Sequence, residues 1–100
     1  MKTGFTYILT NKNRSVLYIG VTANLTRRMH EHASGEGSVF CKRYNVNILI
    51  YYEVFDNIRN AIAREKQLKK WRREWKLELV EKRNPGMKNL MGDMEWFKDE

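Results

Sequence analysis

The sequence has almost no cysteine and no long apolar run, and both absences exclude classes of protein. Its 100 residues include one cysteine, Cys41, so no internal disulfide can hold the fold together. A lone thiol suits a reducing compartment, and we expect a cytoplasmic protein. No segment approaches the roughly 20 apolar residues that a membrane-spanning helix needs. The first ten residues carry one lysine and no small-residue cleavage site, so we expect no signal peptide.

Acidic residues are too few to balance the basic ones. The chain carries 19 lysines and arginines against 12 acids, a formal net charge of +7. Such a surface concentrates anionic partners, and nucleic acid is the commonest of these because phosphate contacts release counterions. The charge alone leaves nucleic-acid binding and a merely basic surface as equal alternatives.

Nothing in the sequence divides the chain into separate domains, since it has no internal repeat, low-complexity tract or linker. A length of 100 residues with 42% hydrophobic content allows one compact core and no second one. We expect a single domain over residues 1–90 and a partly disordered tail over residues 91–100.

Three short apolar runs predict strands. Phe5–Thr10 and Val16–Gly20 are joined by a polar turn and indicate an antiparallel hairpin. Val46–Phe55 is the strongest strand signal, and we expect it at the centre of the sheet.

Polar residues that can cap a helix precede two predicted helices. Asn24 can cap a helix over Leu25–Ala33. The polar pair 56–57 can cap another over Ile58–Lys70. A further helical segment, roughly 72–82, is either separate or a continuation of the one before it. The order β-β-α-β-α-α predicts a small α/β domain of the α+β type, with helices flanking a three-stranded antiparallel sheet.

Two polar side chains fall on or beside the apolar side of the first predicted helix. At about 100° per residue, His32 shares one face with Leu25 and Met29, which should be buried. Arg28 lies beside that face, four positions from His32, so the two side chains can meet over one turn. The alternatives are that Arg28 extends to solvent along its aliphatic stem and that His32 is a hydrogen-bonded residue at the rim.

Glu65 falls amid the apolar stripe of the second long helix. The stripe consists of Ile58, Ala61, Ile62 and Leu68. A carboxylate there costs several kcal/mol unless it finds a cation, a metal or strong donors. The open interpretations are a salt bridge, for example to Arg28, a solvated position at a sheet edge, and a metal ligand in a cleft that faces Arg28.

A run of basic residues follows Glu65. It consists of Lys66, Lys69, Lys70, Arg72, Arg73 and Lys76. We expect these cations, with Arg27 on the solvent side of the first helix, to contact nucleic-acid phosphates. The alternative is an ordinary solvated helix face. The interleaved Trp71 and Trp75 are expected in the core rather than stacked on bases.

The tripeptide Tyr18-Ile19-Gly20 ends the second predicted strand and begins a spaced pattern of residues. Tyr7 precedes Tyr18 by eleven positions. It ends the tripeptide 5–7, which is the first element of the pattern and keeps only its tyrosine. Arg28 follows Tyr18 by ten positions, and His32 comes four residues later. This strand-to-helix pattern resembles the signature of the GIY-YIG endonuclease family.

Two later elements extend the resemblance. Ala61–Leu68 is similar to the family's acidic helix, which implies that Glu65 is the metal-binding glutamate. Asn84 matches a late asparagine of many members and is a further candidate site residue. Over residues 5–90 the chain resembles small stand-alone bacterial members, which are similar to the nuclease domains of excision-repair and homing endonucleases.

The resemblance implies a metal-dependent endonuclease that hydrolyses phosphodiester bonds, with DNA as the expected partner, in repair, recombination or nucleic-acid processing. It implies Mg²⁺ held by Glu65, with Mn²⁺ as a substitute, and Arg28 on the phosphate. Tyr7, Tyr18 and His32 would orient or deprotonate the attacking water, and which of them is the base stays open. Neither a membrane nor an obligate protein partner is expected. The alternatives are a catalytically inactive nucleic-acid-binding module of the same fold and a basic protein-interaction domain.

Overall fold

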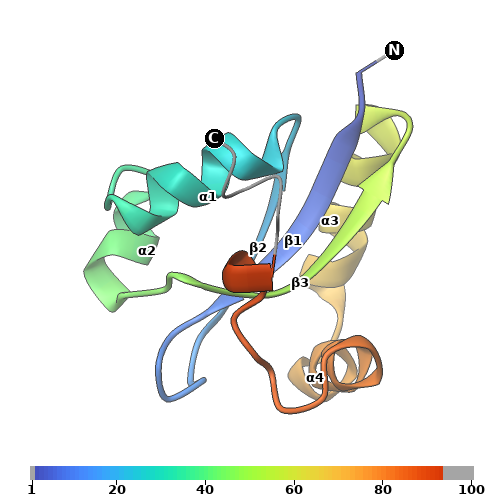
Figure 1. Cartoon of the computed structure of the whole chain (residues 1–100). Coiled ribbons are helices and arrows are strands. Elements are labelled where there is room, and N and C mark those ends of the chain that lie inside the picture. Colours follow the sequence, from blue (N-terminus) through green and yellow to red (C-terminus); the bar gives the residue numbers. More distant parts are fainter. Residues whose placement is uncertain (1, 94–100) are drawn as a thin grey trace.

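Residues 2–93 are described by the computed structural model, and they form a sheet with helices on both faces (Figure 1). The strands are β1 (Gly4–Thr10), β2 (Leu17–Thr22) and β3 (Ile48–Phe55), antiparallel in the order β2-β1-β3. The helices are α1 (Leu25–Ala33), α2 (Val39–Tyr44), α3 (Ile58–Lys70) and α4 (Arg73–Arg83), followed by the 3₁₀ turn η1 (Leu90–Asp93). The predicted α+β class and the order β-β-α-β-α-α are confirmed, with α2 and η1 as additions.

The central strand of the sheet is β1. The expectation that Val46–Phe55 lies at the centre is wrong, because within the described residues β3 pairs with β1 alone. Strand β1 tolerates burial on both faces because its polar side chains find internal partners. The hydroxyl of Thr6 donates to the carbonyl of Ala61, and that of Thr10 donates to the carbonyl of Val16, both at 2.7 Å.

Alternation along β1 divides the apolar residues into two cores, one on each face of the sheet. Tyr7 and Leu9 face α1 and α2, whereas Ile8 faces α3 and α4. The first core adds Leu25, Met29, Cys41, Val46, Leu49 and Met91, and the second adds Ile19, Ile50, Tyr51, Leu68, Val80 and Met87. Side chains on α1 and α3 are therefore separated by the sheet and can approach one another only around an edge strand.

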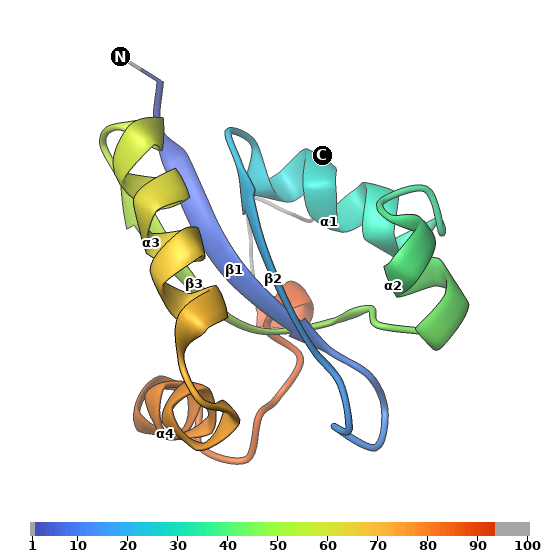
Figure 2. The same cartoon turned by 180° about the vertical axis from the view of Figure 1, so that it is seen from behind.

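Helix α3 lies close against the sheet (Figure 2). A Cβ atom at Gly4 would lie 2.6 Å from Cα of Ile58 and 2.8 Å from Cβ of Ala61, so glycine permits this approach. Of the predicted apolar stripe, Ala61 and Leu68 are buried. Ile62 is 37% exposed, and its assignment to the buried stripe is wrong. The reason is that Ile62 is turned by about 100° from Ala61, away from the sheet.

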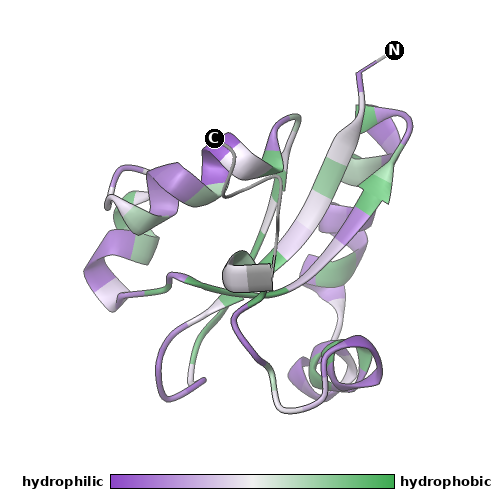
Figure 3. Cartoon of the chain, viewed as in Figure 1, coloured by the Kyte–Doolittle hydropathy of each residue, from purple (hydrophilic) through white to green (hydrophobic). Residues whose placement is uncertain are grey.

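Helices α3 and α4 are separate, which decides between the two alternatives left open by the sequence. Trp71 and Arg72 between them have extended backbones, with ψ angles of 152° and 153°. The hydropathy colouring shows hydrophilic and hydrophobic residues alternating around α4 (Figure 3).

The C-terminal boundary of the domain stays a prediction. The turn η1 contributes the buried Met91 to the first core, and residues 94–100 of the predicted tail lie outside the described residues. Among residues 2–93, no helix combines the length and the apolar character needed to cross a membrane.

Candidate active site

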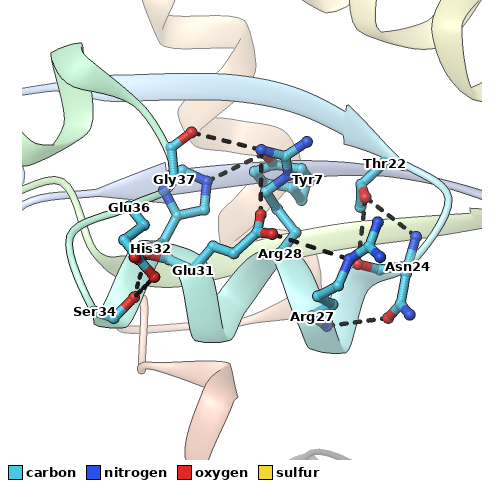
Figure 4. Close-up of polar contacts among 10 residues, drawn as sticks. All are labelled: Tyr7, Thr22, Asn24, Arg27, Arg28, Glu31, His32, Ser34, Glu36 and Gly37. Carbon is cyan, nitrogen blue, oxygen red and sulfur yellow. Dashed lines mark hydrogen bonds and ion pairs between the residues drawn. The ribbon is translucent and has the colours of Figure 1, made fainter.

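Three of the predicted site residues, Tyr7, Tyr18 and His32, gather on the α1 face of the sheet. The ring centroids of Tyr7 and Tyr18 are 6.5 Å apart, and each lies 6.0 Å from the imidazole of His32. The hydroxyl of Tyr7 lies 3.3 Å from Nε2 of His32 (Figure 4). Gly20 is opposite Tyr7 in the β1–β2 register, and a Cβ there would lie 2.4 Å from the Tyr7 hydroxyl oxygen. The glycine of the tripeptide therefore makes room for the Tyr7 ring.

Burial keeps both Tyr7 and His32 uncharged at neutral pH. It raises the pKa of Tyr7, with a further increase from the nearby Tyr18. Burial also lowers the pKa of His32, and the positive charge of Arg28 lowers it further. The Nδ1 atom of His32 is buried and has no hydrogen-bond partner among the described residues. A neutral imidazole in this setting can accept a proton, whereas Tyr7 stays protonated.

The predicted phase of α1 is confirmed, since Leu25, Met29 and His32 are buried. Arg28 lies at the edge of the buried face with its side chain 36% exposed, whereas Arg27 is 74% exposed. The guanidinium of Arg28 donates to the carbonyl of Gly37 at 3.5 Å and pairs with Glu31 at 3.5 Å (Figure 4). Arg28 thus reaches the site, while Arg27 points to solvent.

Glu65 lies on α3. Helices α3 and α1 lie on opposite faces of the sheet (Figures 1 and 2). The side chain of Glu65 is 14% exposed, and its carboxylate pairs with Lys69 one helical turn away at 2.7 Å. The salt bridge that the sequence suggested is thus made, with Lys69 as the partner in place of Arg28. Since α1 and α3 flank opposite faces, Glu65 belongs with the aromatic cluster only if the site extends around the edge strand β2.

A hollow of about 290 Å³ lies at that edge of the sheet. It is lined by Leu17, Tyr18, Ile19, Phe40, Lys69 and Lys76. Tyr18 and Phe40 come from the α1 side and stack with their ring centroids 6.1 Å apart. Lys69 and Lys76 come from the α3 side, so the hollow joins the aromatic cluster to the partner of Glu65.

The basic run is distributed over several surfaces. Lys69 and Lys76 line the hollow, while Arg73 donates to the carbonyl of Arg14 at 2.8 Å. Arg72 lies over the ring of Trp75 at 5.7 Å from its centroid. The expectation that Trp75 is a core residue is wrong, because it is 49% exposed. The remaining residues predicted to contact phosphate, Arg27, Lys66 and Lys70, are exposed.

The side chain of Asn84 is engaged in the fold. It is buried, and its amide donates to the carbonyl of Ile50 at 3.0 Å and of Lys88 at 2.8 Å. Its oxygen accepts from the backbone N–H of Lys88 at 3.2 Å. These bonds tie the end of α4 to β3 and favour a packing role.

Sequence reasoning missed Phe40 and Gly37, which contact the site. Phe40 belongs to the six-residue helix α2, which is too short for a periodic signal. Ser38 caps this helix by accepting from the backbone N–H of Cys41, so a serine that can cap a helix was the available signal.

The residues that could bind a metal ion are few. Among residues 2–93, no group of three or more histidine, cysteine, aspartate or glutamate side chains could enclose an ion. Mg²⁺ needs only one or two carboxylates, with water and substrate phosphate completing its shell. The partly buried Glu65 fits that requirement, provided that its exposed partner Lys69 turns away.

The family model described as the GIY-YIG catalytic domain matches residues 3–78. The chain is 34% identical to a UPF0213 protein of Staphylococcus haemolyticus, covering 83% of this chain and 100% of the relative. It is 40% identical to one of Clostridium perfringens, covering 76% and 81%. The solution NMR structure of a UPF0213 protein from Bacillus halodurans matches with a TM-score of 0.56 at 29% identity, covering 87% and 92%. The chain therefore belongs to the GIY-YIG catalytic-domain family and is similar to the UPF0213 proteins.

Proposed function

We propose that the chain is a metal-dependent endonuclease that hydrolyses phosphodiester bonds, with DNA as its substrate, in repair, recombination or nucleic-acid processing. The proposal is carried by the convergence of Tyr7, Tyr18, His32 and Arg28 beside a hollow whose far wall holds two lysines. Hydrolysis of a phosphodiester needs an acceptor for the proton of water, a cation on the phosphate and neutralisation of the leaving oxygen. The chain has candidates for each of these tasks.

Arg28 is the candidate for the phosphate. Its contacts to Gly37 and Glu31 are both 3.5 Å, longer than the roughly 2.7–2.9 Å of a strong charged hydrogen bond. A phosphate oxygen can therefore displace Glu31 from the guanidinium without a large loss. A guanidinium binds two phosphate oxygens at once and stabilises the negative charge that grows in the transition state.

The aromatic cluster supplies the proton acceptor. Tyr18 lines the hollow and so contacts the attacking water, while Tyr7 and His32 lie behind it. The lowered pKa of His32 leaves the imidazole neutral and ready to accept a proton at neutral pH. Tyr7 has a raised pKa and holds the imidazole by hydrogen bonding to Nε2. We assign the base to His32, whose Nε2 connects to the site through the hydroxyl of Tyr7.

Glu65 is the candidate for the metal site. A bound Mg²⁺ would supply positive charge to the phosphate and to the leaving oxygen. The carboxylate of Glu65 would hold this ion from the α3 side of β2. In the absence of an ion, Lys69 neutralises the same carboxylate at 2.7 Å.

A nucleic-acid-binding module without catalysis is the second candidate. It is favoured by the pairing of Glu65 with Lys69, which satisfies the carboxylate without a metal. The basic residues at the hollow would then bind phosphate, and no bond would be broken.

Incubation of supercoiled plasmid with the protein, with and without millimolar Mg²⁺, separates these candidates. The endonuclease converts plasmid to nicked or linear form only with the metal. Retardation of plasmid on a gel without any cleavage supports the binding module. If the protein neither cleaves nor binds the plasmid, the result supports a basic protein-interaction domain.

A further inference from the structure

The loop over residues 34–38, between α1 and α2, lies against two candidate catalytic side chains. The carbonyl of Gly37 accepts from the guanidinium of Arg28 at 3.5 Å. On the same residue, a Cβ atom would lie 2.5 Å from Nδ1 of His32 and 2.8 Å from its Cε1 and Cγ. Figure 4 shows Gly37 beside both side chains. Gly37 therefore lies against both the proposed proton acceptor, His32, and the proposed phosphate ligand, Arg28.

We propose that Gly37 is a positioning residue, whose carbonyl and missing side chain set the orientations of Arg28 and His32. The catalytic consequence rests on the proposed function, whereas the packing relation to His32 does not.

The ring of His32 has no room to move away from a side chain at position 37. It is 6% exposed, its Nε2 meets the hydroxyl of Tyr7, and the rings of Tyr7 and Tyr18 meet it edge-on. Heavy atoms closer than about 3 Å without a hydrogen bond are strongly repelled, and a packed core transmits the strain. A methyl group at Gly37 must therefore displace either the imidazole or the loop.

Displacement of the loop also affects Arg28. With the Gly37 carbonyl withdrawn, the guanidinium keeps its pairing with Glu31, which lies on the same helix. That pairing draws the guanidinium along α1 rather than towards the hollow. Loss of the Gly37 contact thus disturbs the phosphate ligand and the proton acceptor together.

The requirement at Gly37 is space and not an unusual backbone conformation. Gly35 in the same loop has a φ of +85°, which favours glycine, but a Cβ there would meet Lys42 no closer than 3.8 Å. Gly37 is not among the residues of the described chain with positive φ. Alanine at Gly35 therefore strains the backbone of the same loop and leaves the space around His32 unchanged.

The first test follows the titration of His32 by NMR in Gly37→Ala, without substrate. The groups that face His32 are Tyr7 on β1, Tyr18 on β2, and Arg28 and Glu31 on α1. Displacement reduces the burial that lowers the pKa of His32, so its titration midpoint should move up towards the ordinary value of a histidine, about 6.5. Gly35→Ala should leave the midpoint of His32 where it is in the wild type. An unchanged midpoint in a folded Gly37→Ala protein overturns the proposal.

A double-variant cycle covers the case in which Gly37→Ala does not fold. In a His32→Ala background the methyl group has room, so Gly37→Ala should lower the thermal midpoint much less than it does in the wild type, or restore folding. An equal loss of stability in both backgrounds contradicts the contact.

The catalytic part is read from single-turnover cleavage. Gly37→Ala should reduce the cleavage rate at least tenfold with DNA binding within twofold of wild type, and move the acid limb of the pH–rate profile upward. Gly35→Ala should keep the wild-type profile. A wild-type rate and profile in Gly37→Ala, despite a displaced His32, refutes the catalytic part. If the wild type itself cleaves nothing, the proposed function fails and the titration still decides the packing relation.

Discussion

The hydroxyl of Tyr7 lies 3.3 Å from Nε2 of His32, and burial shifts the pKa of the two groups in opposite directions, up for tyrosine and down for histidine. Tyr18, Arg28 and Glu31 also act on the pair, and Arg28 further lowers the pKa of His32. Both partners are therefore uncharged near neutral pH, and the hydrogen bond between them needs no counter-ion.

This pair predicts a pH dependence of stability. The pKa of His32 is lower in the folded chain than the roughly 6.5 of an unfolded histidine. Between these two values the unfolded chain binds more protons, so the stability from neutral His32 is fully present above about pH 6.5 and is lost as the pH falls through the folded pKa. Thermal melts should show a larger loss from pH 7.5 to pH 5 in the wild type than in His32→Gln. Parallel losses would mean that His32 is not buried as described.

Arg28→Ala should reduce the cleavage rate by a factor of about 100 or more, since loss of a transition-state cation typically costs ~3 kcal/mol. Arg27→Ala is the matched control on the adjacent position, with a side chain that is 74% exposed. It should reduce the rate by less than about threefold, because a surface side chain makes no contact that grows in the transition state. Greater damage from Arg27→Ala would show that the phosphate is bound on the other side of α1.

The two lysines of the hollow should contribute more to DNA binding than their exposed neighbours on α3. Replacement of Lys69 and Lys76 by alanine removes two phosphate contacts, which should lower the slope of log affinity against log salt by about 2. The control replaces Lys66 and Lys70, which are exposed and lie outside the hollow. Filter binding of one duplex fragment at several salt concentrations measures both slopes. Equal slopes in the two double variants would place the phosphates elsewhere.

Gly4→Ala should destabilise the fold by about 1–3 kcal/mol, because the added methyl group cannot fit against α3. The approach is to backbone, 2.6 Å from Cα of Ile58, which cannot turn aside as a flexible side chain can. For a domain of this size the thermal midpoint should fall by roughly 4–8 °C per kcal/mol. Gly92→Ala, which meets nothing within 4 Å, should change it little. A neutral Gly4→Ala would show that α3 is not held against β1 as described.

The helices could be predicted from sequence because their signals are local. Asn24 and Asn57 each accept a backbone N–H of the first turn that follows, and these caps gave α1 and α3 their bounds. The buried phase of α1 followed from the 3.6-residue period, which any nine-residue helix preserves. The position of Arg28 beside His32 was therefore available before the fold was known.

The arrangement of the elements in space could not be predicted from such local signals. Strand β1 can occupy the centre of the sheet because the hydroxyls of Thr6 and Thr10 find carbonyl acceptors. The number of apolar residues in a strand does not reveal such acceptors. Arg28 was one possible partner of Glu65, and it is out of reach because the two helices lie on opposite faces of the sheet, a tertiary fact. The close approach of Gly37 to His32 depends on a loop path that no local pattern encodes.

We expect Glu65 to serve the chemistry and not the fold, and single-turnover cleavage by Glu65→Ala in millimolar Mg²⁺ is the decisive measurement. Its partner Lys69 is 55% exposed, and such pairs contribute at most about 1 kcal/mol, so the variant should stay folded and bind DNA. Glu74→Ala, at an exposed position on α4, is the control and should cleave like the wild type. The cleavage rate should fall at least a hundredfold in Glu65→Ala, with DNA binding retained. Cleavage at the wild-type rate by the folded Glu65→Ala protein would contradict this expectation.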